Sequence, residues 1–505
     1  MALKRVLRAA PSFSLVAAAA LLLSPGLWLG PGFDASVYTL AGLRIRDGYM
    51  PYTDLFDNKP PGLYLLNAFG QMLLPWLDPW LVAWILSLVF TICAILVVNR
   101  LLCRRLSPVA AFLASLVCLA GVASYPIALG GGLTETFAIL PLILALYTLS
   151  TLRSSWRTAA LVAGLGSLAC LFSVQALPAA IVLAGAAVLV GSKPTEAARR
   201  AVAALVGGSF VPLAVAGWLA ARGAIGDAFD QVVVYNGSYR DSSTGLGHML
   251  PVTFAILACL AVPAAIAIVR MLRNPHEFDR VSWLCLGWIL AEVAIVDYEN
   301  RLFLHYLILV LPPIVLLSAP GFEWLMAAVR SSPGRRSRSL GLGIVAASLC
   351  MFYVSALTIA GLIGITTSDS AKAQAVTDST AGWIKAHTPA SATVFLWGND
   401  TDLYLAADRR PYDSHVYQFP MVTAGYWSPG KTAAILSAWT SSPPPVIVES
   451  PANVPMFEPK PDPAEPPDYD TLAPLRSYVR AHYRLAASFG RSDNFADVYV
   501  YVPSS

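Results

Sequence analysis

The sequence predicts a mostly helical membrane protein, in which a polytopic bundle of transmembrane helices is followed by a small α/β domain. Composition is the first reason: 56% of the 505 residues are hydrophobic and 13% are charged, and the mean hydropathy is +0.62. Soluble domains carry about a quarter charged residues, so this chain is not one of them. The second reason is that apolar runs long enough to cross a bilayer recur up to about residue 363.

These runs predict about eleven spans, because a helix needs roughly 18 or more apolar residues to cross the hydrocarbon core. The least separated pair, 158–174 and 176–191, is divided only by the short break FSVQALP. The expected spans lie near residues 9–29, 80–99, 108–128, 133–151, 158–174, 176–191, 201–220, 251–269, 281–296, 302–320 and 340–363.

Basic residues predict the orientation, because short loops rich in lysine and arginine stay in the cytoplasm. Lys4, Arg5 and Arg8 place the N-terminus inside, and every second loop after it is basic, whereas the alternate loops are acidic. An odd number of spans then places the C-terminus outside. A basic start before an apolar run is also typical of a cleaved signal peptide, but no small-x-small site precedes Asp34, so we expect the first span to remain.

We therefore expect a transmembrane domain over residues 1–365 and an extracytoplasmic α/β domain over 366–505, called the tail below. ATVFLWG and PPVIVES predict buried strands, DSTAGWIKAH predicts a helix, and YRLAASF and ADVYVYV predict a closing pair of strands. None of the seven cysteines lies in the tail and no CxxC pair occurs, so neither disulfides nor zinc are expected. No basic stripe suggests nucleic acid.

The first external loop, residues 31–79, concentrates charge at the outer boundary of the bilayer. DASVYTLAGLRIRDG predicts an amphipathic helix with Val37, Leu40, Ala41 and Ile45 on one face, and GLYLLNAFGQMLLPWL predicts a second interfacial helix begun by two prolines. Lys59, held by the rigid Pro60-Pro61 pair, would be a fixed positive point at this depth. Such a site suits a lipid whose phosphate reaches the interface while its tail stays in the membrane.

Several motifs in their order along the chain resemble the type C glycosyltransferases, the family of the lipid A aminoarabinose transferases and protein O-mannosyltransferases. In the first loop these are D-x-x-x-Y, DGYMPYTD and KPPGLY; later pieces are LTETF, VVVYNGSYR, RLFLHYLILVLPP and VFLWGNDTDLYLAADRRPYDS. The resemblance covers most of the chain, and the first-loop block is its specific part. Two positions depart from the pattern: Asn58 stands where relatives have an acid, and Gln175 where a basic residue is common.

The resemblance implies a glycosyltransferase of the bacterial plasma (inner) membrane that moves a sugar, with inversion, from a polyprenyl phosphate to an extracytoplasmic lipid, glycan or protein. Asp34 would be the general base that takes the proton of the acceptor hydroxyl. Lys59 would bind the carrier phosphate, which leaves as an anion and needs positive charge. Further phosphate- or donor-binding candidates are Arg240, Arg301 and His305, and candidates that position the sugar or acceptor are Tyr38, Asp57, Tyr64 and Glu135.

Each assignment has a structural alternative. An aspartate before a helix is most often an N-cap, a lysine at a membrane boundary often extends its ammonium to water, and His305 and Tyr306 also fit an interfacial aromatic belt. Alternative functions are a transporter or flippase of lipid-linked sugars and a surface-polysaccharide polymerase or ligase. A transporter would place charge near the bilayer midplane and show a repeat, and a polymerase would rely on arginines of late loops.

Undecaprenyl or decaprenyl phosphate is the expected carrier, since the excess of arginine over lysine and the abundant alanine suggest a GC-rich bacterial genome. No obligatory cofactor is expected. A divalent ion shared by Asp34 and Glu135 remains the alternative if the fold brings these two carboxylates together.

Overall fold

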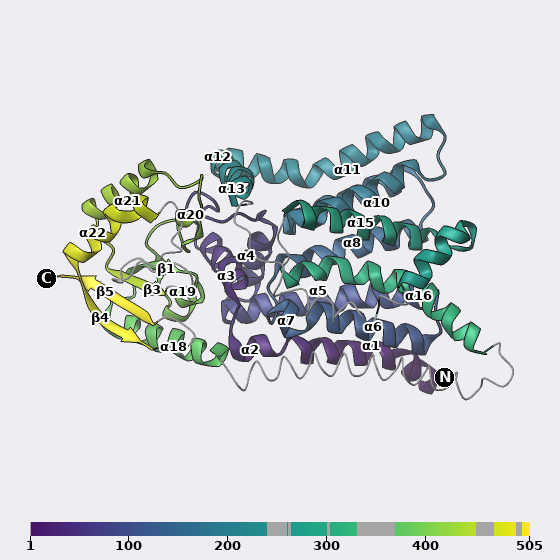
Figure 1. The fold of residues 1–505 in the computed structure, drawn as a ribbon, viewed down its shortest axis with the longest axis horizontal. Coiled ribbons are helices and arrows are strands. Elements are labelled where there is room, and N and C mark those ends of the chain that lie inside the picture. The colour runs from purple at the N-terminus through teal and green to yellow at the C-terminus, as the bar shows by residue number, and fades with distance from the viewer. Residues whose placement is uncertain are drawn as a thin grey trace. The chain divides into compact units, whose positions relative to one another are not determined.

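The computed structural model describes residues 2–239, 260, 264–299, 303–330, 369–450, 469–490 and 497–504, and it divides the chain into two compact units (Figure 1). Unit 1 comprises residues 1–27, 84–217 and 243–362, and unit 2 comprises residues 28–83, 218–242 and 363–505. Unit 2 therefore unites the whole first loop, a middle segment and the tail. Each unit is described separately.

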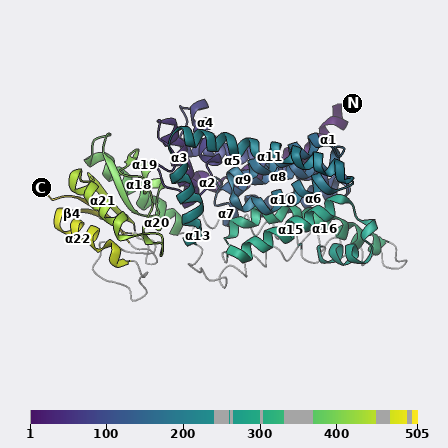
Figure 2. The ribbon, with the colours of Figure 1, turned by 90° about the horizontal axis from the view of Figure 1, so that it is seen from above.

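Unit 1 is a bundle of apolar helices that lie side by side in both views (Figures 1 and 2). Its elements are α1 (Ala2–Leu23), α5 (Pro79–Leu102), α6 (Pro108–Ala123), α7 (Tyr125–Ala128), α8 (Thr134–Thr151), α9 (Trp156–Phe172), η1 (Val174–Ala176), α10 (Leu177–Leu189), α11 (Pro194–Ala221), η4 (Pro275–Glu277), α15 (Arg280–Glu299), η5 (Leu304–Tyr306) and α16 (Leu307–Arg330). The first residues of α5 and the last of α11 belong to unit 2.

A mostly helical, polytopic architecture is confirmed. Within the described residues, five helices are long and apolar enough to cross a membrane, at 12–29, 79–102, 134–151, 194–221 and 304–321, and three shorter apolar helices lie at 108–123, 156–172 and 174–189. The expected span 340–363 and most of 251–269 lie outside the described residues. The count of eleven spans and the orientation stay predictions.

Small residues allow the helices of unit 1 to pack closely. A Cβ at Gly207 of α11 would lie 2.3 Å from the carbonyl oxygen of Ala160 in α9, so only glycine fits at this crossing. Without a hydrophobic effect between helices in lipid, such close backbone contact is a main source of association. Ser107 and Ser155 begin α6 and α9 by accepting hydrogen bonds from backbone N–H groups three residues on.

The short helix α2 (Pro25–Leu29) crosses the boundary between the two units, and in unit 2 the first loop forms α3 (Phe33–Arg46) and α4 (Gly62–Leu73), the last begun by Pro61. The apolar face expected for α3 is buried, as shown by Val37, Leu40 and Ala41, but the helix is not amphipathic in burial, because the polar Ser36 and Thr39 are buried as well. The reason is that α3 packs against α4 on one side and against α19 (Asp402–Ala407) of the tail on another. By contrast, α4 exposes a continuous apolar surface of Phe69, Met72 and Leu73, as an interfacial helix would.

The tail is built on a five-stranded mixed sheet in the order β2-β1-β3-β5-β4. The strands are β1 (Thr393–Gly398), β2 (Arg410–Pro411), β3 (Val446–Ser450), β4 (Tyr483–Phe489) and β5 (Val498–Pro503), so the four strand segments predicted from the sequence are confirmed. β1 is parallel to β2 and β3, whereas β5 is antiparallel to β3 and β4.

Helices cover both faces of this sheet (Figure 1). The helices of the tail are α18 (Asp369–His387), α19, α20 (Phe419–Val422), α21 (Pro429–Ser441), η6 (Tyr469–Leu472) and α22 (Ala473–His482). Phe395 and Trp397 of β1 point to one face, where they form a core with Trp439 of α21 and Val479 of α22. α18 lies on the other face, so this strand is buried on both sides and reads as a continuous apolar run.

The middle segment of unit 2 consists of the short helix α12 (Ile225–Phe229), a π-helical stretch (Asp230–Tyr235) and α13 (Asn236–Tyr239). Its side chains hydrogen-bond to both the first loop and the tail, as described below. π-Helical turns are rare and frequently occur at functional sites.

Candidate active site

Asp34 lies in the first turn of α3, and its neighbours fix that turn against the tail. The ring of Phe33 makes edge-to-face contacts with Tyr417 and Phe419, at centroid distances of 5.4 and 5.7 Å. Ser36 Oγ is hydrogen-bonded to Thr401 Oγ1. The side chain of Asp34 is half-buried and forms no hydrogen bond or ion pair with the described residues, and Gly32, not Asp34, is the N-cap. The carboxylate is therefore not consumed by helix capping.

The main chain at Lys59 is held by two tyrosine side chains. The hydroxyl of Tyr52 donates to the carbonyl oxygen of Lys59 at 2.8 Å, and the hydroxyl of Tyr64 lies 3.1 Å from the same oxygen. Pro60 and Pro61 follow directly and restrict the backbone further. Tyr38 stacks on Tyr64 with ring centroids 5.9 Å apart, so α3 and α4 share one aromatic cluster beneath this loop.

Asp57 is buried, with 4% of its surface exposed, and both of its carboxylate oxygens are occupied. Oδ1 accepts hydrogen bonds from the Tyr417 hydroxyl at 3.0 Å and from the Asn58 backbone N–H at 2.8 Å, and Oδ2 accepts from the Tyr64 hydroxyl. Burial raises the pKa of Asp57 to about 6, although these hydrogen bonds and the nearby charge of Lys59 act to lower it. The structure thus surrounds this carboxylate with protein groups.

The middle segment connects the first loop to the tail. The Gln231 side-chain amide accepts from the Asp57 N–H at 3.1 Å and donates to the Tyr52 carbonyl at 2.7 Å. On the other side, the Tyr426 hydroxyl donates to Asp230 Oδ2 at 2.5 Å, and the Lys431 ammonium lies 3.3 Å from the centre of the Tyr426 ring. Three stretches far apart in sequence therefore meet around residues 52–64.

Polar side chains also gather where β1 and β3 end. After β1 the chain forms β2 on one side of the sheet, and after β3 it forms β4 at the opposite edge. The carboxyl ends of β1 and β3 therefore mark the point where the strand order reverses, which in open α/β sheets is the usual ligand side. Asp400 and Ser450 hydrogen-bond to each other there. Gln418 donates its backbone N–H to the Gly398 carbonyl at 3.0 Å. This end of the sheet is the one that contacts the first turn of α3.

Unit 1 contains a second buried carboxylate. Glu135, in the first turn of α8, is 1% exposed, and its Oε1 accepts hydrogen bonds from the hydroxyls of Thr134 at 3.0 Å and Ser173 at 3.1 Å. Ser173 Oγ also lies 2.7 Å from Gln175 Oε1, and Gln175 Nε2 lies 3.3 Å from the Tyr306 hydroxyl oxygen. The position expected to hold a basic residue, Gln175, is therefore in the hydrogen-bonded cluster of Glu135.

The orientation of the Gln175 amide follows from counting protons. A serine hydroxyl has one hydrogen, so Ser173 cannot donate to Glu135 and Gln175 at once. With the amide oxygen and nitrogen of Gln175 exchanged, Tyr306 donates to Gln175, Gln175 to Ser173, and Ser173 to Glu135, and every hydrogen bond has a donor. The cluster is then a chain of donors that ends on the carboxylate.

The remaining candidates have different outcomes. Arg240 and Arg301 lie outside the described residues. His305 is half-buried in unit 1, where its ring stacks on Phe303 at 5.4 Å and meets Tyr306 edge-on. Asp34 belongs to unit 2 and Glu135 to unit 1, so a shared ion stays a hypothesis. Among the described residues no group of three or more histidine, cysteine or acidic side chains is close enough to hold a metal.

Sequence reasoning did not single out several residues that build these clusters: Tyr52, Tyr417, Gln231 and Ser173. Tyr52 and Ser173 lie inside quoted segments, DGYMPYTD and FSVQALP, and these segments were the available signal. Gln231 directly precedes the motif VVVYNGSYR, and Tyr417 ends the tail segment RRPYDSHVY, but neither residue was named by itself.

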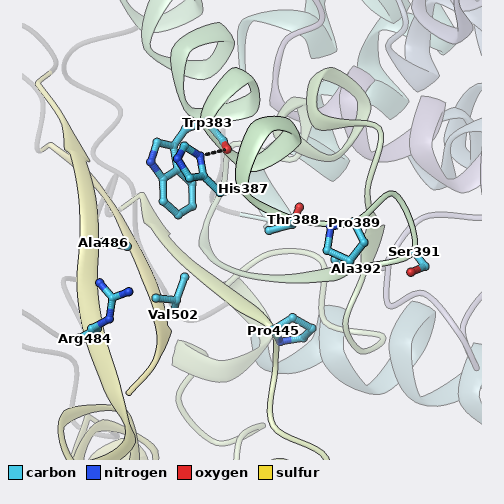
Figure 3. A pocket seen from close by; sticks show the side chains of 10 residues that line it. All are labelled: Trp383, His387, Thr388, Pro389, Ser391, Ala392, Pro445, Arg484, Ala486 and Val502. Carbon is cyan, nitrogen blue, oxygen red and sulfur yellow. Dashed lines mark hydrogen bonds between the residues drawn. The ribbon is translucent and has the colours of Figure 1, made fainter. Parts of the chain in front are cut away.

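A groove of about 790 Å³ in the tail is lined by exposed and half-buried side chains, among them Trp383, His387, Thr388, Arg484 and Val502 (Figure 3). The His387 ring stacks on Trp383 at 4.3 Å and contacts its carbonyl. The groove includes Ala392, just before β1, whereas the tail contacts α3 beyond the other end of that strand. The groove is therefore separate from the clusters around Asp34 and Lys59.

Comparisons with known proteins rest on structure. No family model matches the sequence, and no curated protein matches it. The ArnT protein of Cupriavidus metallidurans, solved with undecaprenyl phosphate bound, superposes over 97% of this chain and 97% of its own, with a TM-score of 0.62 and 14% identity. The oligosaccharyltransferase of Archaeoglobus fulgidus superposes over 98% of this chain and 74% of its own, with a TM-score of 0.53 and 13% identity.

The chain has the type C glycosyltransferase fold. The likeness extends over both units, because nearly the whole of this chain and of ArnT superposes. The family-like motifs of the sequence thus lie on the fold that their resemblance implied. At this level of identity the superposition establishes the architecture, and the chemistry of the site rests on the residues of this chain.

Proposed function

We propose that this protein is a membrane glycosyltransferase that transfers a sugar from a polyprenyl-phosphate carrier to an acceptor outside the cytoplasm. The observation that carries the proposal is that one tail residue, Tyr417, contacts the immediate neighbour of Asp34 and a residue two positions from Lys59. The proposed base and the proposed phosphate-binding residue therefore belong to one packed cluster. The fold and the undecaprenyl phosphate bound by ArnT support the same donor class.

In the proposed reaction the acceptor hydroxyl attacks the anomeric carbon of the sugar from the face opposite the carrier phosphate. Asp34 takes the proton of that hydroxyl; a new glycosidic bond forms, the bond from the anomeric carbon to the phosphate oxygen breaks, and the phosphate leaves with the electron pair. The half-buried carboxylate of Asp34, which no described residue engages, suits this role. The ammonium of Lys59 would stabilise the negative charge of the phosphate.

Recognition of the acceptor is assigned to the tail. The carboxyl ends of β1 and β3 present polar side chains beside the first turn of α3, and amide, hydroxyl and carboxylate groups such as Gln418, Ser450 and Asp400 are suited to sugar hydroxyls. Glu135 would position a hydroxyl of the sugar or acceptor, because the described residues donate to only one of its oxygens.

The test is turnover of a panel of radiolabelled polyprenyl-phosphate sugars by the purified full chain and by its Asp34→Asn and Lys59→Ala variants. We expect one donor to be used, Asp34→Asn to lower kcat by about 10³-fold with donor binding retained, and Lys59→Ala to weaken donor binding. If no donor binds, or if both variants act as the wild type does, the proposal fails. Export of the intact lipid-linked sugar would instead support a flippase.

A further inference from the structure

The hydrogen bonds of Asp57 join parts of the chain that are 360 residues apart. Tyr417 reaches Asp57 from the tail, Tyr64 reaches it from α4, and both side chains are almost fully buried. The Asp57 carboxylate accepts three hydrogen bonds in all, one of them from the Asn58 backbone. A carboxylate used in this way is a junction between elements, and protein donors occupy three of its roughly four acceptor positions.

The hydroxyl oxygen of Tyr64 links the Asp57 carboxylate to the main chain of Lys59. The Tyr64 hydroxyl that donates to Asp57 lies 3.1 Å from the Lys59 carbonyl oxygen, which also accepts from Tyr52. The Gln231 amide bridges the Asp57 N–H and the Tyr52 carbonyl, which closes a ring of contacts around residues 52–59. Displacement of Tyr417 would leave Asp57 with one fewer donor and shift this ring.

We propose that Tyr417 and Asp57 are positioning residues through which the tail sets the main chain at Lys59 for binding of the carrier phosphate. The inference rests on the proposed function, because it assigns Lys59 to a phosphate. It adds a role for the tail beyond acceptor recognition: the tail supplies a hydroxyl on which the donor site depends. Since a phosphate is bound well only when the cation is held at the correct place, a small shift of Lys59 weakens binding.

The group to which the Tyr64 hydroxyl donates depends on whether the Asp57 carboxyl is protonated. Tyr64 has one hydrogen, which it gives to the ionised Asp57; when Asp57 is protonated, the carboxyl can donate to Tyr64 and Tyr64 can donate to the Lys59 carbonyl. The titratable groups that face Asp57 are Lys59 and Tyr52 of its own loop, Tyr64 of α4 and Tyr417 of the tail. Asp57 has a pKa of about 6, so its protonation state changes near that pH.

The competing explanation is that Tyr417 merely docks the tail. The chain offers two matched controls, each a tail tyrosine with one hydroxyl hydrogen bond. Tyr426 donates to Asp230 of the middle segment; its ring contacts Phe56, but its hydroxyl takes no part in the hydrogen bonds around residues 52–59. Tyr478 donates to the Trp439 carbonyl inside the tail, at 2.9 Å. Replacing each by phenylalanine removes a hydroxyl of the same kind.

The experiment measures the Kd of undecaprenyl phosphate for the purified full chain in detergent. We expect Tyr417→Phe and Asp57→Asn to raise the Kd by about 3- to 10-fold, and Tyr426→Phe and Tyr478→Phe to change it by less than about 2-fold. In a Lys59→Ala background Tyr417→Phe should have no further effect, because it acts through Lys59. The ratio of the Kd of Asp57→Asn to the wild-type Kd should change near pH 6, because the second ionisation of the carrier phosphate, also near pH 6, affects both proteins alike.

Three results overturn the inference: a Kd for Tyr417→Phe equal to that of Tyr478→Phe, an equal rise for Tyr426→Phe, or an undiminished effect of Tyr417→Phe in the Lys59→Ala background. These outcomes are distinct from failure of the proposed function, in which Lys59→Ala itself leaves the Kd unchanged. If Tyr417→Phe does not fold, as judged by its thermal transition, Asp57→Asn and its pH profile carry the test.

Discussion

Two buried carboxylates, Asp57 in unit 2 and Glu135 in unit 1, differ in how the protein uses their oxygens. Both are almost completely enclosed, at 4% and 1% exposed. Asp57 accepts hydrogen bonds on Oδ1 and on Oδ2, from two tyrosines and a backbone N–H. Glu135 accepts two, both on Oε1, and no described residue donates to its Oε2. The two carboxylates are therefore similarly buried, but they differ in whether an oxygen is left for a further hydrogen-bond donor.

This difference separates two kinds of acid that look alike in a sequence. A carboxylate with fixed donors on both oxygens holds elements in place, whereas one with an open oxygen can still bind a hydroxyl that arrives with a substrate. On this argument we propose that Glu135 contacts the sugar or the acceptor and that Asp57 acts on binding through Lys59. The following expectations are ordered from the largest effect to the smallest.

Glu135→Gln should lower turnover more than Asp57→Asn does. The amide keeps the size of the side chain but places an N–H group where the carboxylate accepts, and it removes the negative charge. We expect kcat to fall by about 10²-fold with the Kd of the carrier phosphate little changed, as for a group acting in the transition state. Steady-state kinetics beside Asp57→Asn would test the contrast. If Asp57→Asn lowers kcat and Glu135→Gln only raises the donor KM, the two roles are reversed.

The pH dependence of stability should distinguish Asp57 directly. Burial raises its pKa to about 6 in the folded protein, above its ordinary value of 3.8, so the folded state holds the proton more tightly. As pH rises from about 4 to about 6, the free energy of unfolding should therefore fall by on the order of 3 kcal/mol. Above about pH 6 the contribution of Asp57 should stay level.

The measurement is the difference in Tm between Asp57→Asn and wild type at about pH 4.5 and at about pH 7.5, which cancels the titration of other groups. The variant should gain several degrees relative to wild type at the higher pH. A relative gain at the lower pH instead would mean that the tyrosine hydroxyls stabilise the ionised carboxylate more than burial destabilises it.

The sequence predicted those parts of the fold that are set by local pattern. Long apolar runs became helices, and the alternating and apolar segments of the tail became β1, β3, β4 and β5. The polar face of α3 was misjudged, because Ser36 and Thr39 read as solvent-facing until the contact of Ser36 with Thr401 is known. No periodicity records a partner 365 residues away.

The sequence predicted residues of the candidate site but not the hydrogen bonds that join them to distant parts of the chain. The first-loop block pointed to Asp34, Lys59 and Tyr64, but the sequence could not show that Asp57 is sealed by Tyr417 or that Gln175 is hydrogen-bonded next to Glu135. These contacts are set by long-range packing. A departure from the family pattern, such as Asp57 and Asn58 before the lysine, indicates that the contacts there are unusual but does not say which residues make them.

Ser173→Ala should reduce turnover by about 10-fold, less than Glu135→Gln. It removes one of the two hydroxyl donors to Glu135 and breaks the chain from Tyr306, while Thr134 continues to donate. Ser115→Ala is the matched control, because Ser115 is equally buried in unit 1 and bonds to Ala111 and Asn99 instead. Equal losses in the two variants would show that the effect is one of helix packing and that Glu135 does not depend on Ser173.

Tyr306→Phe should have the smallest effect, about a 2-fold fall in kcat. Its hydroxyl is the far end of the donor chain, 3.3 Å from Gln175 Nε2, and both partners are neutral, so the bond contributes less than one to a carboxylate. Phenylalanine keeps the edge-to-face contact with His305, which isolates the hydroxyl. Kinetics of Tyr306→Phe, Ser173→Ala and the double variant decide the point: if the chain acts as a unit, the double variant equals Ser173→Ala. Independent, multiplying losses would mean that Tyr306 acts on the reaction by another route.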